Sequence, residues 1–146
     1  MSMSCIVMTP HSGENELIDS IPTVYSLFDF YTQHEMIAIN RFITPRRRVP
    51  YDNETITELQ CRLNNKTGII ILHSPKEAEL LGVKIKAVLM LRRSVFNEIL
   101  KDLDVHYVLD AKEKFFEIVD HHGAIESFND EAELVKRATD ICNETN

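Results

Sequence analysis

A short run of β-branched residues constrains the fold more than any other feature of this sequence. Gly68 precedes the run Ile69-Ile70-Ile71-Leu72, and Pro75 follows it. Such a run is typical of a buried strand, because β-branched side chains fit a pleated sheet and the segment is too short for a helix of its own. The sequence therefore predicts a strand at residues 69–72.

A second extended segment follows after a polar connection. Val83, Ile85 and Ala87 alternate with polar residues or glycine before the apolar run 88–91, so we expect a half-buried strand within residues 81–91. The connection at residues 74–80 is longer than a tight hairpin turn but short enough to join an antiparallel pair. The strands at 69–72 and 83–91 are therefore predicted to be adjacent and antiparallel.

Three further elements are predicted in the first half of the chain. The apolar run from Ser4 to Met8, which Thr9-Pro10 ends, indicates a first strand. A helix is expected from Ser20 to about Gln33, with a stripe at helical spacing that packs on the sheet and includes a buried Phe28. Another helix is expected from Asn53 to Asn64. The stripes are Val24, Leu27, Phe28 and Tyr31 in the first helix and Ile56, Leu59 and Leu63 in the second.

Beyond Ser94 the apolar spacing becomes helical. We predict one helix around Val95, Ile99 and Leu103, one that ends near Gly123, and a final one. Asp110 with Glu113, and Asp130 with Glu133, have the spacing of capping boxes at helix starts. The remaining stripe residues are Phe115, Ile118 and Val119, then Leu134, Val135, Ala138, Ile141 and Cys142. The expected fold is a single α/β (α+β) domain over residues 1–146, with a small sheet that contains an antiparallel pair and a helical C-terminal third at residues 94–146.

Net charge excludes two classes of partner. The 23 acidic and 16 basic side chains give a formal charge of −7, whereas nucleic acids and anionic membranes need a positive surface. No apolar run approaches the roughly 20 residues of a membrane span. The one basic cluster, Arg46 to Arg48 between Pro45 and Pro50, is expected to be a solvated loop or, alternatively, a local contact for an anion. We expect no nucleic-acid and no membrane partner.

The cysteines indicate a reducing compartment. Cys5, Cys61 and Cys142 are odd in number and widely spaced, which suits neither a disulfide framework nor a paired-cysteine zinc site. The N-terminus lacks the pattern of a signal peptide. We therefore expect a cytoplasmic protein with three reduced thiols.

Tests for catalytic and metal-binding motifs give no complete site. His121 and His122 are adjacent and cannot share one helix face, so they are expected to mark a helix C-terminus, and no metal site is predicted. His34 and His73 are expected to be surface or edge histidines and not catalytic bases. Cys61, close in sequence to Leu59 and Leu63, is expected to be structural. The four glycines cannot form a dinucleotide fingerprint or a phosphate-binding loop.

One segment resembles a known family. Residues Phe28 to Asn40, which read FDFYTQHEMIAIN, resemble the early segment of arylalkylamine-type N-acetyltransferases of the Gcn5-related superfamily, and Glu35 occupies the glutamate position. The helix at 53–64, the strand at 68–72 and Leu81-Gly82-Val83 are similar in form to the next elements of that family. The resemblance covers residues 22–92. It implies acetyl-coenzyme A as cofactor, a small amine as substrate, and Glu35 as the general base or its support.

The family's coenzyme loop, Gln/Arg-x-x-Gly-x-Gly/Ala, is missing from this sequence. Its backbone N–H groups hold the coenzyme pyrophosphate. The resemblance thus implies the amine-side half of an acetyltransferase, truncated or inactive as this chain alone. The alternative hypothesis is a non-catalytic protein–protein interaction domain, supported by the missing loop and the helical C-terminal third.

Overall fold

The computed structural model describes residues 3–43 and 53–144. Within them the chain forms a five-stranded sheet in the order β2-β3-β1-β4-β5, and every neighbouring pair of strands is parallel. The strands are β1 (Met3–Met8), β2 (Val24–Tyr25), β3 (Gly68–Leu72), β4 (Lys84–Leu91) and β5 (Glu126–Phe128). The helices are α1 (Glu14–Ser20), the 3₁₀ helix η1 (Leu27–Asp29), α2 (Gln33–Ile43), α3 (Asn53–Cys61), α4 (Pro75–Leu81), α5 (Arg93–Lys101), α6 (Val105–Val119) and α7 (Glu131–Glu144).

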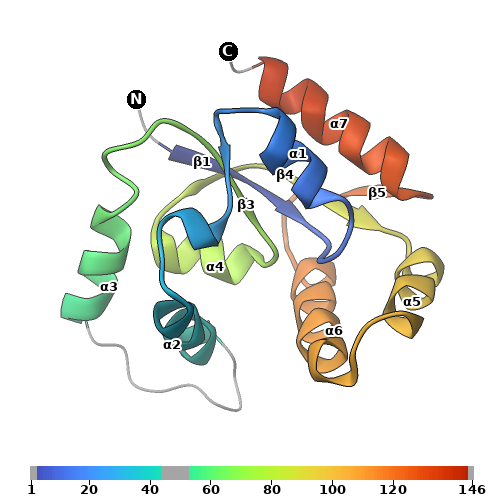
Figure 1. Ribbon diagram of the computed structural model, residues 1–146, viewed down its shortest axis with the longest axis horizontal. Coiled ribbons are helices and arrows are strands. Elements are labelled where there is room, and N and C mark those ends of the chain that lie inside the picture. The colour runs from blue at the N-terminus through green and yellow to red at the C-terminus, as the bar shows by residue number, and fades with distance from the viewer. Residues whose placement is uncertain (1–2, 44–52, 145–146) are drawn as a thin grey trace.

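Helices cover both faces of the sheet (Figure 1). Parallel strands buried on both faces need continuous apolar runs, which the central strands β1 and β3 provide. Cys5 and Ile70 face a core shared with α2, α3, α4 and α6, whereas Ile6 and Ile71 face a core shared with α1 and α7. A third cluster, built on Phe96 and Phe115, joins α5 to α6. The predicted strands at 4–8 and 69–72 are therefore confirmed.

The predicted antiparallel pair is wrong. β3 and β4 lie on opposite sides of β1 and both run parallel to it, with Cys5 between Ile70 and Ile85. The physical reason is α4, which occupies the presumed connecting loop and carries the chain back to start a parallel strand. Ser74 caps this helix by accepting a hydrogen bond from the Lys76 N–H, Pro75 takes its first turn, and Gly82 ends it in the left-handed conformation. The fold class is thus α/β with a parallel sheet, not a sheet with an antiparallel pair.

The predicted helix from Ser20 to Gln33 is also wrong. Val24 and Tyr25 instead form the edge strand β2, which pairs with Ile69 and Ile70 of β3. Ser26 and Asp29 then make a reciprocal capping box for the short helix η1. Phe28, expected in the core, is 72% exposed. Pairing with β3 outweighs the helical spacing of the stripe, which is a weak signal over one or two turns.

The second half of the chain follows the prediction more closely. The helices around Val95, before Gly123 and after Asp130 are confirmed as α5, α6 and α7. Asp130 accepts a hydrogen bond from the Glu133 N–H, as its spacing predicts. Asp110 lies inside α6, which Asp104 caps instead, so that predicted helix start is wrong. The predicted strand at 81–91 begins at Lys84, and the short edge strand β5 was not predicted.

Candidate binding site at the carboxyl edge of the sheet

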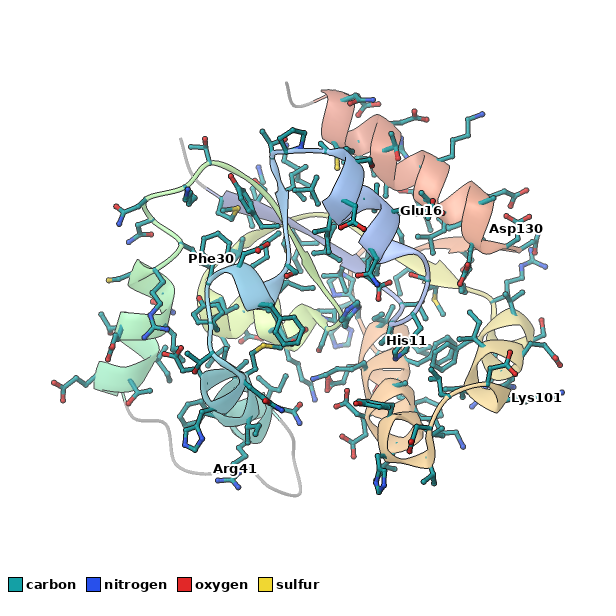
Figure 2. All side chains as sticks on the ribbon, viewed as in Figure 1. His11, Glu16, Phe30, Arg41, Lys101 and Asp130 are labelled. Atoms are coloured by element: carbon teal, nitrogen blue, oxygen red, sulfur yellow. The ribbon has the colours of Figure 1, made fainter. Side chains whose placement is uncertain are left out.

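The parallel sheet brings the loops after its strands to a single edge. At this edge β1 and β4 are neighbours, but the chain continues from them in opposite directions across the sheet. After β1 it crosses to β2, on the side of β3, and after β4 it crosses to β5 on the other side. Open α/β sheets bind ligands outside the carboxyl ends of strands at such a switch in direction. The candidate site therefore consists of the loop at residues 9–13, the start of α5 and the end of β3. Figure 2 labels His11 in this loop, on the side of the view where α5 and α6 lie.

Buried hydrogen bonds fix the β1–α1 loop. The Thr9 hydroxyl oxygen accepts a hydrogen bond of 3.0 Å from the Leu91 N–H, which ties the ends of β1 and β4 together. The Ser12 hydroxyl donates a hydrogen bond of 2.5 Å to the Thr9 carbonyl oxygen. Both side chains are fully buried. The loop is therefore held in one shape by its own polar groups.

The carboxylate of Glu14 occupies the backbone donors of this loop. One oxygen accepts from the His11 N–H at 3.1 Å and the other from the Ser12 N–H at 2.9 Å. His11 adopts a φ of 60°, in the left-handed region that a residue other than glycine seldom occupies. In phosphate-binding loops, backbone N–H groups at this place between a strand and a helix hold the anion. Here an internal carboxylate takes that position.

His73, just after the end of β3, lies close to Glu14. Its Nδ1 lies 2.9 Å from the Met8 carbonyl oxygen, so Nδ1 carries the proton because a carbonyl oxygen can only accept. Its backbone N–H donates to the carboxylate of Glu77, which is buried on α4. Nε2 lies 3.9 Å from the nearer Glu14 oxygen, too far for a hydrogen bond. His73 thus binds the end of β1 and forms an ion pair with Glu14 only when it is protonated.

A small cavity opens beside the start of α5. Its volume is about 280 Å³, and its walls come from the ends of β4 and β5, the first residues of α5 and the second half of α6. The Arg93 guanidinium lies 5.3 Å from the centre of the Phe116 ring, a cation–π contact. Within the described residues, neither Arg92 nor Arg93 makes an ion pair. The lining residues are Met90, Arg92, Arg93, Phe115, Phe116, Val119 and Ser127.

Glu35 lies away from this edge, at the start of α2. One carboxylate oxygen accepts a hydrogen bond of 2.9 Å from the Thr32 N–H, and the Thr32 hydroxyl accepts one from the Glu35 N–H. The other oxygen pairs with the guanidinium of Arg62, which directly follows the end of α3. Hydrogen bonds from Arg62 and from the Thr32 backbone lower the pKa of Glu35 to about 2. Its role as a general base stays a prediction, and its contacts are those of a helix cap that also pairs with the turn after α3.

The other singled-out residues lie apart from one another. Arg46 to Arg48 fall outside the described residues. His121 and His122 follow the end of α6, as predicted. None of the three cysteines forms a disulfide; Cys61, expected to be structural, is exposed, whereas Cys5 and Cys142 are buried. Among residues 3–43 and 53–144, no cluster of three or more His, Cys, Asp or Glu side chains could hold a metal ion.

Comparisons with known proteins add little to this geometry. No family model matches the chain, and no curated protein matches it. Among solved structures, it is similar to the unliganded crystal structure of a sugar kinase from a Janibacter species, with 12% sequence identity over 98% of this chain and 95% of that chain and a TM-score of 0.49. That score is too low to support an argument about function. Across the part of the chain that the structure describes, no helix is both long and apolar enough to cross a membrane.

Sequence reasoning missed the residues that form this edge. Glu14 was not singled out, although it directly follows the polar loop that ends β1. Arg92 and Arg93, which directly follow the predicted strand at 81–91, were not singled out either. Each of these groups directly follows an apolar strand or its loop, and that position could have indicated the site. It does so only once β1 and β4 are known to be parallel neighbours.

Proposed function

We propose that this chain is a non-catalytic protein–protein interaction domain. The observation that carries the proposal is the position of the Glu14 carboxylate. It accepts hydrogen bonds from the His11 and Ser12 backbone N–H groups, which are the donors that a phosphorylated ligand would need at this end of β1. A ligand phosphate would have to displace Glu14 and would meet its negative charge.

The same reasoning bears on acetyl-coenzyme A. The coenzyme carries several phosphate charges and needs converging N–H donors or cations. The family's pyrophosphate loop is missing from the sequence, and the loop after β1 satisfies its donors internally. The low pKa of Glu35 also makes this carboxylate a weak base at neutral pH. These observations favour the interaction domain over the acetyltransferase-like alternative, in which Glu35 acts on a small amine.

The proposal extends to the compartment and the kind of partner. Three cysteines that form no disulfide suit the reducing cytoplasm. The formal charge of −7 disfavours nucleic acid and anionic membranes, so the partner is a protein. A protein partner can be selected by complementary charge at the few places where this acidic chain presents cations.

Calorimetric titration tests the proposal. The full chain is titrated separately with acetyl-coenzyme A and with magnesium ATP, and we expect no saturable heat at micromolar concentrations. A parallel assay measures release of free coenzyme A in the presence of arylalkylamines. Saturable micromolar binding together with amine-dependent release would overturn the proposal in favour of the acetyltransferase. Glu35→Gln would then identify the base, because loss of turnover with retained coenzyme binding distinguishes a catalytic role from a structural one.

A further inference from the structure

Helix α6 presents an apolar stripe to the outside of the molecule. Its stripe residues follow one another at alternating spacings of four and three residues, which places them on a single face of the helix. We call these residues the α6 stripe: Val105, Leu109, Lys112, Phe116 and Val119. The four apolar members are 76%, 61%, 47% and 48% exposed in chain order. The adjacent side of α6, whose residues directly precede stripe residues, packs inward through Ala111, Phe115 and Ile118.

The stripe runs into the cavity beside α5. Phe116 and Val119 belong to both, so the cavity forms one end of a longer apolar surface. At about 280 Å³ the cavity lies below the roughly 300 to 1,000 Å³ of pockets for drug-sized ligands. It therefore suits one large side chain and not a coenzyme. An apolar surface that continues along a helix beyond such a cavity fits a helical segment of a partner better than a free small molecule.

Charges around the stripe define the partner further. Asp110, Glu113 and Asp120 each directly follow a stripe residue and form an acidic flank along one side of it. Arg92 and Arg93 lie at the cavity, and Lys112 lies at the centre of the stripe. A partner helix that suits this surface has carboxylates opposite the three cations and basic groups opposite the acidic flank.

These charges argue against a second copy of this chain as the occupant. A twofold axis brings the same surface of each copy together. Antiparallel pairing of two α6 helices would therefore set Lys112 against Lys112 and the acidic flank against itself. Like charges placed directly opposite each other disfavour such an interface.

We propose that the α6 stripe and the adjoining cavity bind an amphipathic helix of a partner protein, with apolar residues at matching spacing and carboxylates that meet Lys112, Arg92 and Arg93. An apolar side chain of the partner fills the cavity against Phe116, and a neighbouring carboxylate meets the two guanidinium groups. This inference rests on the proposed function and adds the surface and the chemistry of the partner.

A synthetic helical peptide of about 15 residues, the length of α6, tests the proposal. It carries leucines at four-three spacing, glutamates at the centre and one end of the leucine stripe, and lysines along one flank. Titration into ¹⁵N-labelled chain is expected to shift amide resonances of α6 and of Arg92 and Arg93 saturably. A scrambled peptide of the same composition is expected to leave them unchanged. Equal shifts with both peptides, or shifts confined to other elements, would overturn the proposal.

Charge-reversal variants test the cations. Lys112→Glu changes an exposed side chain without touching the core, and we expect it to weaken the peptide by about fivefold, the effect of one well-placed surface ion pair. Arg92→Ser with Arg93→Ser is expected to weaken it at least as much. The matched control is Lys136→Glu, an exposed charge reversal on α7 across the sheet from α6 (Figure 1), which is expected to bind as the unchanged chain does. Equal affinity of the Lys112→Glu and Lys136→Glu variants would contradict the proposal.

Sedimentation equilibrium tests whether a second copy of this chain occupies the α6 stripe. We expect a monomer, and a dimer that Phe116→Ser abolishes would show that the surface binds a second copy and would overturn the inference. Failure of the peptide experiments would rule out the α6 stripe as the binding surface but would leave the proposal of a non-catalytic domain intact. Coenzyme binding with turnover removes the non-catalytic proposal whatever the peptide does, so the two failures are distinguishable.

Discussion

The Glu14 carboxylate accepts a 2.9 Å hydrogen bond from the Ser12 backbone N–H, and through it the first residue of α1 closes the loop that enters the helix. A second bond, from the His11 N–H, completes the arrangement. Two backbone donors that would otherwise be free for an anion are thus used within the chain. Because Glu14 caps its own helix in this way, the described residues of this edge offer no open phosphate site.

Loss of the Glu14 carboxylate should reduce stability. Glu14→Ala is expected to lower the free energy of unfolding by about 1 kcal/mol, within a range of roughly 0.5 to 2, because it removes a cap from two backbone N–H groups. Urea denaturation measures this. The matched control is Glu16→Ala in the same first turn, whose exposed side chain should contribute less than about 0.5 kcal/mol. Equal losses for both variants would show that the Glu14 bonds do not stabilise the loop.

Two phenylalanines distinguish the observed fold from the one predicted. Phe28→Ala should change the free energy of unfolding by less than about 0.5 kcal/mol, because the ring is exposed. Phe96→Ala should cost about 3 to 5 kcal/mol, because that ring is buried and stacks on Phe115 with 4.6 Å between ring centres. Chemical denaturation of both variants measures the difference. A loss of several kcal/mol for Phe28→Ala would restore the helix predicted at residues 20–33.

The ion pair between Glu35 and Arg62 makes a pH-dependent contribution to stability. The pKa of Glu35 is about 2 in the folded chain, below the value near 4.3 of an unperturbed glutamate. A lowered folded pKa means that the stabilisation is present above the unfolded value and is lost as pH falls toward 2. Unfolding of the unchanged chain and of Glu35→Gln should therefore differ at pH 6 and converge only as the pH falls to about 2. A stability difference that grows toward low pH would contradict this assignment.

The same pair can be tested directly by NMR. Titration of the Glu35 side-chain carboxyl should give a pKa near 2, and Arg62→Gln should raise it, because the Arg62 hydrogen bond is the largest cause of the shift. The hydrogen bond from the Thr32 backbone N–H remains in that variant, so the pKa should stay somewhat below the unperturbed value. An unchanged pKa in Arg62→Gln would show that the two side chains do not pair in solution.

The three thiols should differ in reactivity. Cys61 is exposed and should react readily with a thiol-specific disulfide reagent in the native chain. Cys5 should not, because burial, with a smaller effect of the nearby Glu77 charge, raises its pKa to about 12. Burial also raises the pKa of Cys142. One fast thiol in the native chain and three after unfolding are expected, and rapid native labelling of Cys5 would contradict the buried position of β1.

Apolar patterns predicted most elements but not how they are arranged. Ile69 to Leu72 identified β3 because a short β-branched run has few other uses. The same pattern does not encode the direction of pairing, which depends on whether the following segment turns or crosses over. Ser74, Pro75 and Gly82 did carry the crossover signal, as a cap, a first turn and a stop. The segment was short enough to be mistaken for a loop.

The candidate site was less predictable than the fold for a related reason. Glu14 and His73 are far apart in the sequence, and their proximity follows from the parallel pairing of β1 with β3. Asp110 had the spacing of a helix cap, yet Asp104 caps α6, because two acidic residues compete for one helix start and the sequence alone does not rank them. A site built from loop backbone donors leaves no side-chain motif to find.

The amide resonances of His11 and Ser12 give the most direct test of the central claim that Glu14 keeps this loop closed to phosphorylated ligands. The ¹⁵N-labelled chain is titrated with magnesium ATP and with acetyl-coenzyme A, each to about 1 mM, a concentration that detects even weak binding. We expect both amide signals to stay in place in the unchanged chain. Saturable shifts of His11 and Ser12 would show that a phosphate displaces the Glu14 carboxylate and would contradict the account.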